Sequence, residues 1–522
     1  MYQNRVDGAY LCPMENVRVR FAPSPTGGLH LGGVRTVLYN YLFARQHGGK
    51  FVLRIEDTDQ NRYVEGAEKY IIDCLNWVGL QPDESPEKSG PYAPYRQSER
   101  KEIYRRYAVQ LVEQGNAYYA FDTPEDLEHM RTTFKTEAHP SPQYDSRIRM
   151  KMKNSLSLSP VETETLINNG TPYVIRILMP ENEELHFTDL IRGEVSFQTG
   201  QSDDKVLLKA DGMPTYHLAV VVDDYLMKIT HAFRGEEWLP SAPAHILLWR
   251  YLGWEKNMPL WAHLPLILKP DGHGKLSKRD GDKLGFPVFA MNWTDPKSGD
   301  LTEGFKERGF LPEAFLNMLA VLGWNDGTEQ EIFSLEDLVK RFSIERVHKG
   351  GAKFDFEKAK WFNHEWIKRS PNERLFPDVK AIFDKAGIPT NELDLVKIIG
   401  MVKERCTLLP DFLEQSSFFF VRPVNYDLAA MKGKWDDNKA GYFIAVSEKL
   451  QAIENWDAIT LETAFKTLAT EKNIKAGELL FLFRMMLVGG KFGPPVFDIA
   501  TMLGRQETIA RIGAMSNIMN PV

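Results

Sequence analysis

The chain has 522 residues, of which 43% are hydrophobic and 26% charged, and its net charge is −7. This composition excludes a disordered chain, and the negative charge excludes a protein that binds nucleic acid through a uniformly basic surface. The length predicts three to five domains. The cysteines, Cys12, Cys74 and Cys406, are too few and too far apart for a disulfide framework or a thiolate zinc site.

The N-terminus carries no targeting signal that we recognise. Residues 1–16 include Arg5, Asp7 and Glu15 and lack an apolar core, so we expect no signal peptide. No run of about 18 apolar residues is present, so we expect no membrane span. A reducing cytoplasm fits these features.

Residues 18–33 read as a strand, a loop and the start of a helix. Val17, Val19 and Phe21 alternate with arginines, and prolines and glycines then end the strand. A helical apolar pattern begins at Leu31, so its free N–H groups form a candidate phosphate site with His30 at the entrance. A turn without a ligand is the alternative.

Residues 51–55 predict a second strand, which ends in Glu56, Asp57 and Asp59. Carboxylates at this end of a strand point into the ligand crevice of a doubly wound sheet. The alternative is a helix cap, the role that we expect of Asp59. Helices are predicted over residues 67–78 and 97–114, with a loop over residues 80–94 between them.

Residues 117–212 break the alternation of strand and helix. The segment is rich in threonine, proline and charge, with short strands at 173–178 and 194–197. We interpret it as an insertion that carries a basic patch at residues 147–153. The sheet is expected to resume with strands at 214–222 and 229–234, followed by a helix over residues 241–251.

A basic loop follows residues 264–268. Its sequence is Lys275-Leu-Ser-Lys-Arg279, and Gly272, Gly274 and Gly281 flank it. Three cations and a hydroxyl on a glycine-hinged loop can neutralise charge on a leaving pyrophosphate. A solvated surface loop is the alternative. Beyond residue 300 the apolar spacing is helical, in segments such as 311–322, 335–342, 395–402, 479–487 and 499–512.

The loop at His30 and the loop at Lys275 together resemble the HIGH and KMSKS signatures of class I aminoacyl-tRNA synthetases. Two longer segments are similar to the bacterial type of glutamyl-tRNA synthetase. They are Arg20-Phe-Ala-Pro-Ser-Pro-Thr-Gly and Leu53-Arg-Ile-Glu-Asp-Thr-Asp59. The resemblance continues through residues 97–100, 214–218 and 234–238 and covers nearly the whole chain, more loosely after Trp366.

The resemblance implies an α/β fold: a Rossmann-like, doubly wound parallel-sheet catalytic domain with an inserted α+β acceptor-stem domain and an all-α C-terminal anticodon-binding region. The expected boundaries are 1–116 and 213–265 for the catalytic domain, 117–212 for the insertion, 266–350 for the lysine-loop domain, and 351–408 and 409–522 for two anticodon-binding domains. A helical tail excludes the relatives whose anticodon domain is a β-barrel.

The resemblance also assigns roles to single residues. The catalytic residues are His30, Lys275, Lys278 and Arg279. Glutamate is held by Arg20, Ala22, Ser24, Glu56, Tyr216 and Arg234, because a buried acidic side chain requires counter-charges. ATP is held by Gly28, His30, Gly32, Gly33, Glu237, Ser277 and Lys278. Candidate tRNA contacts are Arg484, Lys491 and Arg505, for which plain surface charge is the alternative.

The implied reaction forms glutamyl-adenylate from glutamate and ATP and transfers glutamate to the 3′-terminal adenosine of tRNA(Glu). ATP with Mg²⁺ is expected, zinc and a membrane are not, and a monomer is the family default.

Two positions depart from the pattern of the family: Val220 replaces an asparagine of some relatives, and Gly33 replaces a second histidine. A glutaminyl enzyme, a tRNA-modifying paralogue, a small nucleotidyltransferase and a non-catalytic tRNA-binding protein are the alternatives. Whether tRNA(Gln) is also charged, and whether tRNA must bind before activation, stays open.

Overall fold

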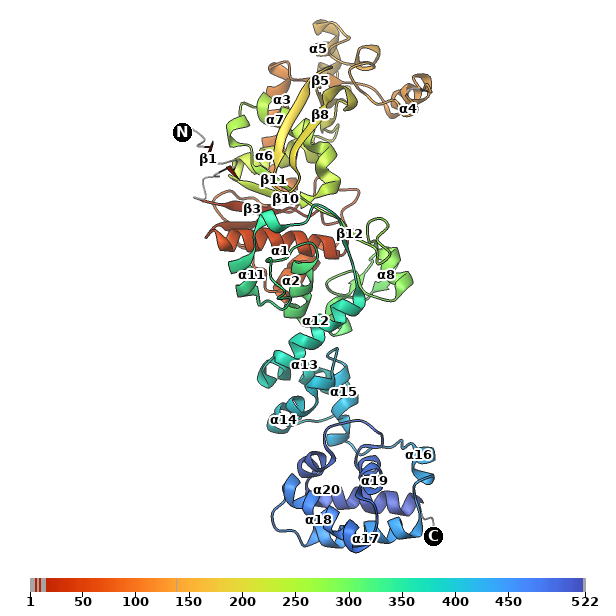
Figure 1. Ribbon diagram of the computed structural model, residues 1–522. Helices are drawn as coiled ribbons and strands as arrows, with labels where there is room; N and C mark the ends of the chain where they lie inside the picture. The colour runs from red at the N-terminus through yellow and green to blue at the C-terminus, as the bar shows by residue number, and fades with distance from the viewer. Residues whose placement is uncertain (1–4, 7–8, 11–15, 138, 520–522) are drawn as a thin grey trace. The chain divides into compact units, whose positions relative to one another are not determined.

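The structure, a computed structural model, describes residues 5–6, 9–10, 16–137 and 139–519 (Figure 1). The chain divides into two compact units, Met1–Glu307 with Phe315–Phe356 and Arg308–Ala314 with Glu357–Val522. Most of residues 1–16, where we expect no signal peptide, lies outside the described residues. Across the described ranges, no helix is both long and apolar enough to cross a membrane.

The first unit is built on a six-stranded sheet with the order β4-β3-β10-β11-β7-β8. The first five strands are parallel, and β8 runs antiparallel to β7. The strands are β3 (Arg18–Phe21), β4 (Lys50–Leu53), β7 (Glu184–Asp189), β8 (Gly193–Gln198), β10 (His231–Gly235) and β11 (Leu260–Leu264).

Helices cover both faces of this sheet (Figure 1). On one face lies α1 (Leu31–Gln46), whose Phe43 ring packs 5.2 Å from the ring of Phe233. The neighbouring Ala232 faces the other way, into an apolar cluster with α3, α6 and α7, because successive side chains of a strand alternate in direction. The α/β layered fold predicted from the sequence is thus confirmed.

The other elements of this unit are short. The helices are α2 (Ala67–Trp77), α3 (Lys101–Glu113), α4 (Pro124–Thr133), α5 (Pro160–Asn168), α6 (Tyr216–Leu226), α7 (Ala242–Tyr251), α8 (Lys278–Leu284), α9 (Phe305–Arg308), α10 (Pro312–Val321) and α11 (Leu335–Arg341). The strands are β1 (Arg5–Val6), β2 (Ala9–Tyr10), β5 (Ala117–Ala120), β6 (Val174–Ile177), β9 (Val206–Leu208), β12 (Ile267–Leu268), β13 (Trp293–Thr294), β14 (Leu301–Thr302) and β15 (Ala352–Lys353).

The strand predicted over residues 214–222 is wrong, because these residues open helix α6. Leu218 to Asp224 are all buried, and a short run that is apolar on every side has no period that separates a buried strand from a buried helix. The prediction that Asp59 caps the next helix is also wrong. Helix α2 begins at Ala67 after Gly66, and Asp59 pairs instead with Arg62 at 2.6 Å.

The segment 117–212 is joined to the central sheet. Strands β5, β6 and β9 form a separate antiparallel sheet, but β7 and β8 extend the six-stranded sheet, with Asp189 of β7 paired to Trp261 of β11. Within the expected basic patch, Arg149 is buried and lies 3.2 Å from the carboxylate of Asp204. Arg149 therefore does not belong to a surface patch.

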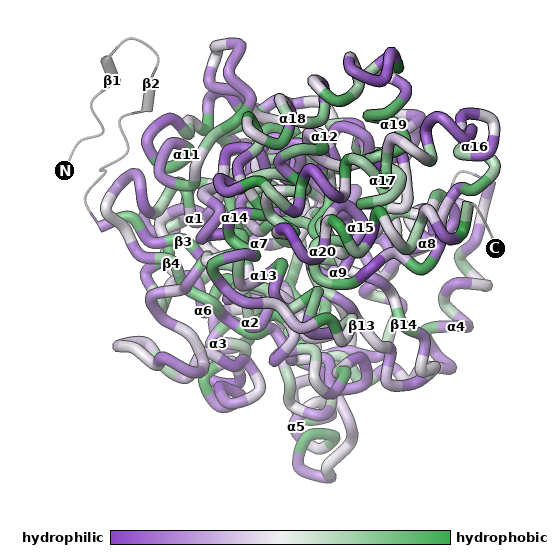
Figure 2. The backbone as a smooth tube through the Cα atoms, turned by 90° about the horizontal axis from the view of Figure 1, so that it is seen from below, coloured by the Kyte–Doolittle hydropathy of each residue, from purple (hydrophilic) through white to green (hydrophobic). Residues whose placement is uncertain are grey.

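The second unit is helical in its described residues, as the apolar spacing predicts. Its helices are α12 (Phe356–Arg369), α13 (Asn372–Lys385), α14 (Glu392–Val402), α15 (Asp411–Ser416), α16 (Leu428–Lys432), α17 (Asp437–Gln451), α18 (Ala458–Glu471), α19 (Ala476–Val488) and α20 (Val496–Met519). One apolar cluster runs from Leu311 to Phe412 and another from Phe418 to Met515. Helices such as α17 carry both hydrophilic and hydrophobic turns (Figure 2), as expected of helices with one face in a core.

Candidate active site

The carboxyl ends of β3, β10 and β11 border a cavity of about 940 Å³. Its walls come from five separate parts of the chain, around residues 20–36, 56–62, 209–238 and 264–277 and at Gln97. Twelve of the residues predicted from the sequence line it: Arg20, Ala22, Ser24, His30, Gly32, Gly33, Glu56, Tyr216, Arg234, Glu237, Lys275 and Ser277.

Gly28 and Lys278 line a second cavity of about 280 Å³, which shares Ser24 and Thr26 with the first. A Cβ atom on Gly28 would lie 3.1 Å from the side chains of Phe289 and Trp293, so glycine allows this close packing. Arg279 lines neither cavity and is exposed.

His30 caps the first turn of α1. Its Nδ1 accepts a hydrogen bond from the amide of Gly32 at 3.4 Å, so in the neutral ring the hydrogen lies on Nε2, for which the described part of the chain offers no hydrogen-bond partner. Burial, aided by the charge of Lys275, lowers the pKa of His30 to about 4. At neutral pH His30 therefore offers an uncharged N–H donor at the helix N-terminus.

The basic loop is held as a small hairpin. The amide of Leu276 donates to the Ile267 carbonyl at 2.9 Å, and the intervening turn places Gly272 and Gly274 at φ near +80°, a conformation that favours glycine. Lys275 Nζ donates to Glu237 Oε1 at 2.6 Å. The loop and the residue assigned to the nucleotide side therefore meet directly at the cavity.

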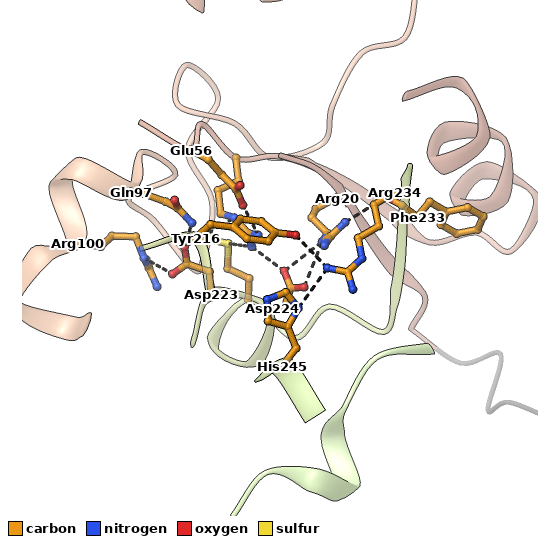
Figure 3. Close-up of polar contacts among 12 residues, drawn as sticks. Arg20, Glu56, Gln97, Arg100, Tyr216, Asp223, Asp224, Phe233, Arg234 and His245 are labelled. Atoms are coloured by element: carbon orange, nitrogen blue, oxygen red, sulfur yellow. Dashed lines mark hydrogen bonds and ion pairs between the residues drawn. The ribbon is translucent and has the colours of Figure 1, made fainter. Parts of the chain in front are cut away.

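Beneath the cavity lies a buried network of arginines and carboxylates (Figure 3). Arg20 Nε donates to both oxygens of Asp224 at 3.1 and 3.2 Å, and Arg54 Nη1 donates to the same carboxylate at 2.8 Å. The other terminal nitrogen of Arg54 donates to Glu56 at 3.0 Å. The charge of Arg20 is thus already compensated by a carboxylate, which the sequence did not reveal.

Asp223 extends this network to Gln97, Arg100 and Tyr104. Its carboxylate accepts hydrogen bonds from Gln97 at 2.9 Å, from Arg100 at 2.8 Å and from the Tyr104 hydroxyl at 2.8 Å. All of these groups are buried. Burial raises the pKa of Glu56 above its usual value, while the nearby guanidinium of Arg54 acts in the opposite direction.

Arg234 has a different environment, with neutral partners only. Its Nε donates to His263 Nε2 at 2.9 Å, and its Nη1 donates to the Tyr216 hydroxyl at 2.9 Å and lies 3.2 Å from His245 Nδ1. Burial and the charge of Arg234 lower the pKa of His245 well below its usual value. Nη2 of Arg234 is buried without a partner among the described residues.

The candidate tRNA contacts lie in the helical unit, and two of them are engaged within it. Arg484 Nη1 donates to the carbonyls of residues 492, 493 and 494. Arg505 donates to the Ile453 carbonyl and lies over the Trp456 ring at 5.6 Å. Lys491 is largely exposed, 3.7 Å from Asp427. Of the three, Lys491 has the most accessible charge.

Sequence reasoning missed several residues of the site. Arg54 lies inside a quoted motif, and a charge at the end of an apolar strand was the available signal for a buried ion pair. Asp189, His245 and His263 carry no local signal. Val220, the departure from some relatives, packs in the apolar cluster of α6 and α7. Among the described residues, no group of three His, Cys, Asp or Glu side chains is arranged to hold a metal ion.

Comparison with known proteins agrees with this geometry. A family model described as the catalytic domain of class I tRNA synthetases (E and Q) matches residues 16–361, and one for an anticodon binding domain matches residues 360–515. The glutamate–tRNA ligase of Amoebophilus asiaticus is 51% identical over 97% of this chain and 99% of its own length. That of Christiangramia forsetii is 52% identical over 95% and 98%.

Among solved structures, a glutamate tRNA ligase from Elizabethkingia meningosepticum in complex with its amino acid superposes with a TM-score of 0.92 at 47% identity. The match covers 97% of this chain and all of that one. This chain therefore belongs to the class I aminoacyl-tRNA synthetases, in the family of bacterial glutamate–tRNA ligases.

Proposed function

We propose that this chain activates L-glutamate with ATP and transfers it to the 3′-terminal adenosine of tRNA(Glu), with release of pyrophosphate and AMP. The α-carboxylate of glutamate attacks the α-phosphorus of ATP, and the terminal ribose hydroxyl of the tRNA then attacks the adenylate carbonyl. Both steps depend on positioning and charge stabilisation rather than on a protein nucleophile.

The unpartnered Nη2 of Arg234 carries this proposal. It is a buried donor on a permanent cation whose described partners are all neutral, in a cavity large enough for an amino acid and a nucleotide. Such a group is costly unless a ligand supplies the counter-charge. The side-chain carboxylate of glutamate supplies it, and the amide of glutamine does not.

The amino group of glutamate is assigned to Glu56 and its remaining polar contacts to Ser24 and the Tyr216 hydroxyl. All three line the cavity with Arg234. For the ammonium to bind, Glu56 must be ionised, and Arg54 at 3.0 Å favours that state. Arg20 supports the pocket through its pair with Asp224, and Ala22 forms part of the wall.

The nucleotide is assigned to the opposite wall, with Mg²⁺ entering as part of ATP and held chiefly by phosphate oxygens and water. The Nε2–H of His30 donates to phosphate at the N-terminus of α1, and Gly32 and Gly33, whose amides donate to His30, line the same wall without side chains. Lys275, Lys278 and Arg279 offset charge on the departing pyrophosphate, and Ser277, whose hydroxyl donates to Asp280, lines the same wall. Lys275 also donates to Glu237 in this structure, and its ammonium has two further N–H groups that can donate to phosphate.

We further propose that the insertion within 117–212 binds the acceptor stem and that the helical domains 351–408 and 409–522 bind the anticodon arm. The domain model that matches residues 360–515 supports the second assignment. A monomer in the cytoplasm, where ATP and tRNA are available, is the proposed working form.

The test is to compare Arg234→Ala with the parent enzyme in ATP–pyrophosphate exchange in the presence of tRNA(Glu) and in charging, with glutamate and with glutamine. We expect kcat/KM for glutamate to fall by about a hundredfold or more, the scale for a truncated partner of a buried charge pair, and residual activity with glutamine to change little. Arg250→Ala, which removes an arginine that pairs with Glu183 outside the cavity, is the control. Equal losses with both amino acids would contradict the assignment of Arg234.

A further inference from the structure

Three polar residues form a row across the sheet at the carboxyl ends of adjacent strands. Arg234 on β10 is directly opposite His263 on β11, and the neighbouring strand β7 ends at Asp189. The Asp189 carboxylate accepts a hydrogen bond from His263 Nδ1 at 2.5 Å, and His263 Nε2 accepts one from Arg234 Nε at 2.9 Å. Asp189 and His263 do not line the cavity.

Asp189 is itself fixed by the backbone. Its Oδ1 accepts hydrogen bonds from the amides of Ile191 at 3.0 Å and Arg192 at 2.9 Å, and its Oδ2 from the amide of His263 at 3.2 Å. Together with the ring of His263, these donors hold the pKa of Asp189 below its usual value against the effect of burial. Asp189 is therefore an ionised acceptor with a fixed orientation.

An ionised acceptor at Nδ1 determines the tautomer of His263. The hydrogen lies on Nδ1, so Nε2 keeps its lone pair and can accept from Arg234. Burial and the charge of Arg234 lower the pKa of His263, although Asp189 acts in the opposite direction. The ring is fully buried between Phe187, Trp261, Asp189 and Arg234, and in its neutral form it presents an acceptor to the guanidinium.

The remaining contacts of Arg234 then determine which nitrogen is free. With Nε held by His263 and Nη1 held by Tyr216 and His245, the planar guanidinium has only Nη2 left to donate. The Trp261 ring lies 5.2 Å from its central carbon and limits its tilt. Rotation of Arg234 would require the hydrogen bond to His263 to break.

We propose that Asp189 and His263 are positioning residues, which hold Arg234 so that its Nη2 meets the side-chain carboxylate of the amino-acid substrate. The proposal rests on the function proposed above. It predicts a defect confined to the amino acid, because the row touches Arg234 and neither the basic loop nor the helix entrance at His30. Protonation of His263, or the reversed tautomer, would place an N–H donor against the Arg234 N–H and weaken the alignment.

The experiment measures KM for glutamate, KM for ATP and kcat in charging of tRNA(Glu) by four variants of the full chain. His263→Leu removes the acceptor, and we expect KM for glutamate to rise about tenfold, the scale of one lost buried hydrogen bond, with KM for ATP unchanged. His263→Gln keeps an oxygen acceptor near the position of Nε2 and should recover most of the loss. Asp189→Asn can donate to Nδ1 and reverse the tautomer, so it should also raise KM for glutamate.

His186→Leu is the matched control, since it removes an exposed histidine from β7. Equal changes in both KM values, or a His263→Gln variant as impaired as His263→Leu, would overturn the proposal. If His263→Leu does not fold, KM for glutamate is compared between Asp189→Asn and His263→Gln. A raised KM in Asp189→Asn with a KM near that of the parent in His263→Gln supports the proposal, and the same KM in both variants overturns it. Failure of the proposed function itself would be visible separately, as a parent enzyme that does not charge tRNA(Glu) with glutamate.

Discussion

Arg54 is the centre of the charge network, and its removal gives the most direct test of that network. The side chain is fully buried, donates to Asp224 at 2.8 Å and to Glu56 at 3.0 Å, and lies 3.7 Å from Asp223. We consider Arg54→Met and Asp224→Asn, singly and together. Methionine is unbranched like arginine and fills much of the space without the charge.

The expected magnitude follows from burial. Truncating one partner of a buried pair costs about 3–5 kcal/mol, because the other charge is left without compensation. A domain is stable by only about 5–15 kcal/mol, so Arg54→Met should lower the unfolding temperature of the first unit strongly. In the double variant, position 224 no longer carries a charge that Arg54 would offset. The loss of unfolding free energy in the double variant should therefore be smaller than the sum of the losses in the two single variants, by about 1–3 kcal/mol.

Calorimetric unfolding of the four proteins measures this coupling. The control cycle is Arg250→Met with Glu183→Gln, a partly exposed pair on the same unit, for which we expect a coupling below about 1 kcal/mol. If the losses of unfolding free energy in Arg54→Met and Asp224→Asn were additive within about 0.5 kcal/mol, the two side chains would not be coupled. Our account of the buried network of arginines and carboxylates beneath the cavity would then be wrong.

Two further predictions concern catalysis and pH. Lys278→Ala should lower the single-turnover rate of glutamate activation by about a hundred- to a thousandfold with little change in KM for glutamate, and a loss of only a few-fold would contradict the role of the basic loop. His231, buried at the start of β10, has its pKa lowered from 6.5 to about 4. Below pH 6.5 His231 binds a proton in the unfolded chain, whereas in the folded chain it stays neutral until about pH 4. The free energy of unfolding therefore decreases as the pH is lowered through this interval, by about 2 kcal/mol at pH 5. His231→Phe should reduce the difference in unfolding temperature between pH 7 and pH 5, and an unchanged difference would contradict this cause.

Features with a local signal could be predicted from the sequence. The strand, loop and helix around His30, and the basic loop at Lys275, each have their pattern within about twenty residues, and the cavity brings the two together as the resemblance implies. Where the signal was ambiguous, prediction failed. The valines from Val220 to Val222 favour a strand by propensity, yet they lie in helix α6, because β propensity is weak and tertiary context overrides it.

The row formed by Asp189, His263 and Arg234 could not be predicted, because these residues are distant from one another in the sequence. His263 lies 74 positions from Asp189 and 29 from Arg234, and each residue taken alone reads as an ordinary polar side chain at the end of a strand. Only the strand order β10-β11-β7 makes them neighbours. The insertion that carries β7 is therefore linked to Arg234 at the cavity through the sheet, which its composition gave no reason to expect.

The structure also changes the explanation of how a glutamate pocket discriminates. The sequence predicts two arginines, Arg20 and Arg234, as counter-charges for the acid, but Arg20 is paired with Asp224. Arg234, by contrast, has no carboxylate in direct contact among the described residues, and its hydrogen-bond partners His263, Tyr216 and His245 are neutral. On the proposed function, the side-chain carboxylate of glutamate supplies that direct partner, whereas the neutral amide of glutamine leaves the buried Arg234 guanidinium without a counter-charge. We therefore expect discrimination between these two amino acids of similar shape to depend on Arg234, and removal of the carboxylate of Asp223, which contacts Gln97, Arg100 and Tyr104, should weaken glutamate binding less than removal of Arg234.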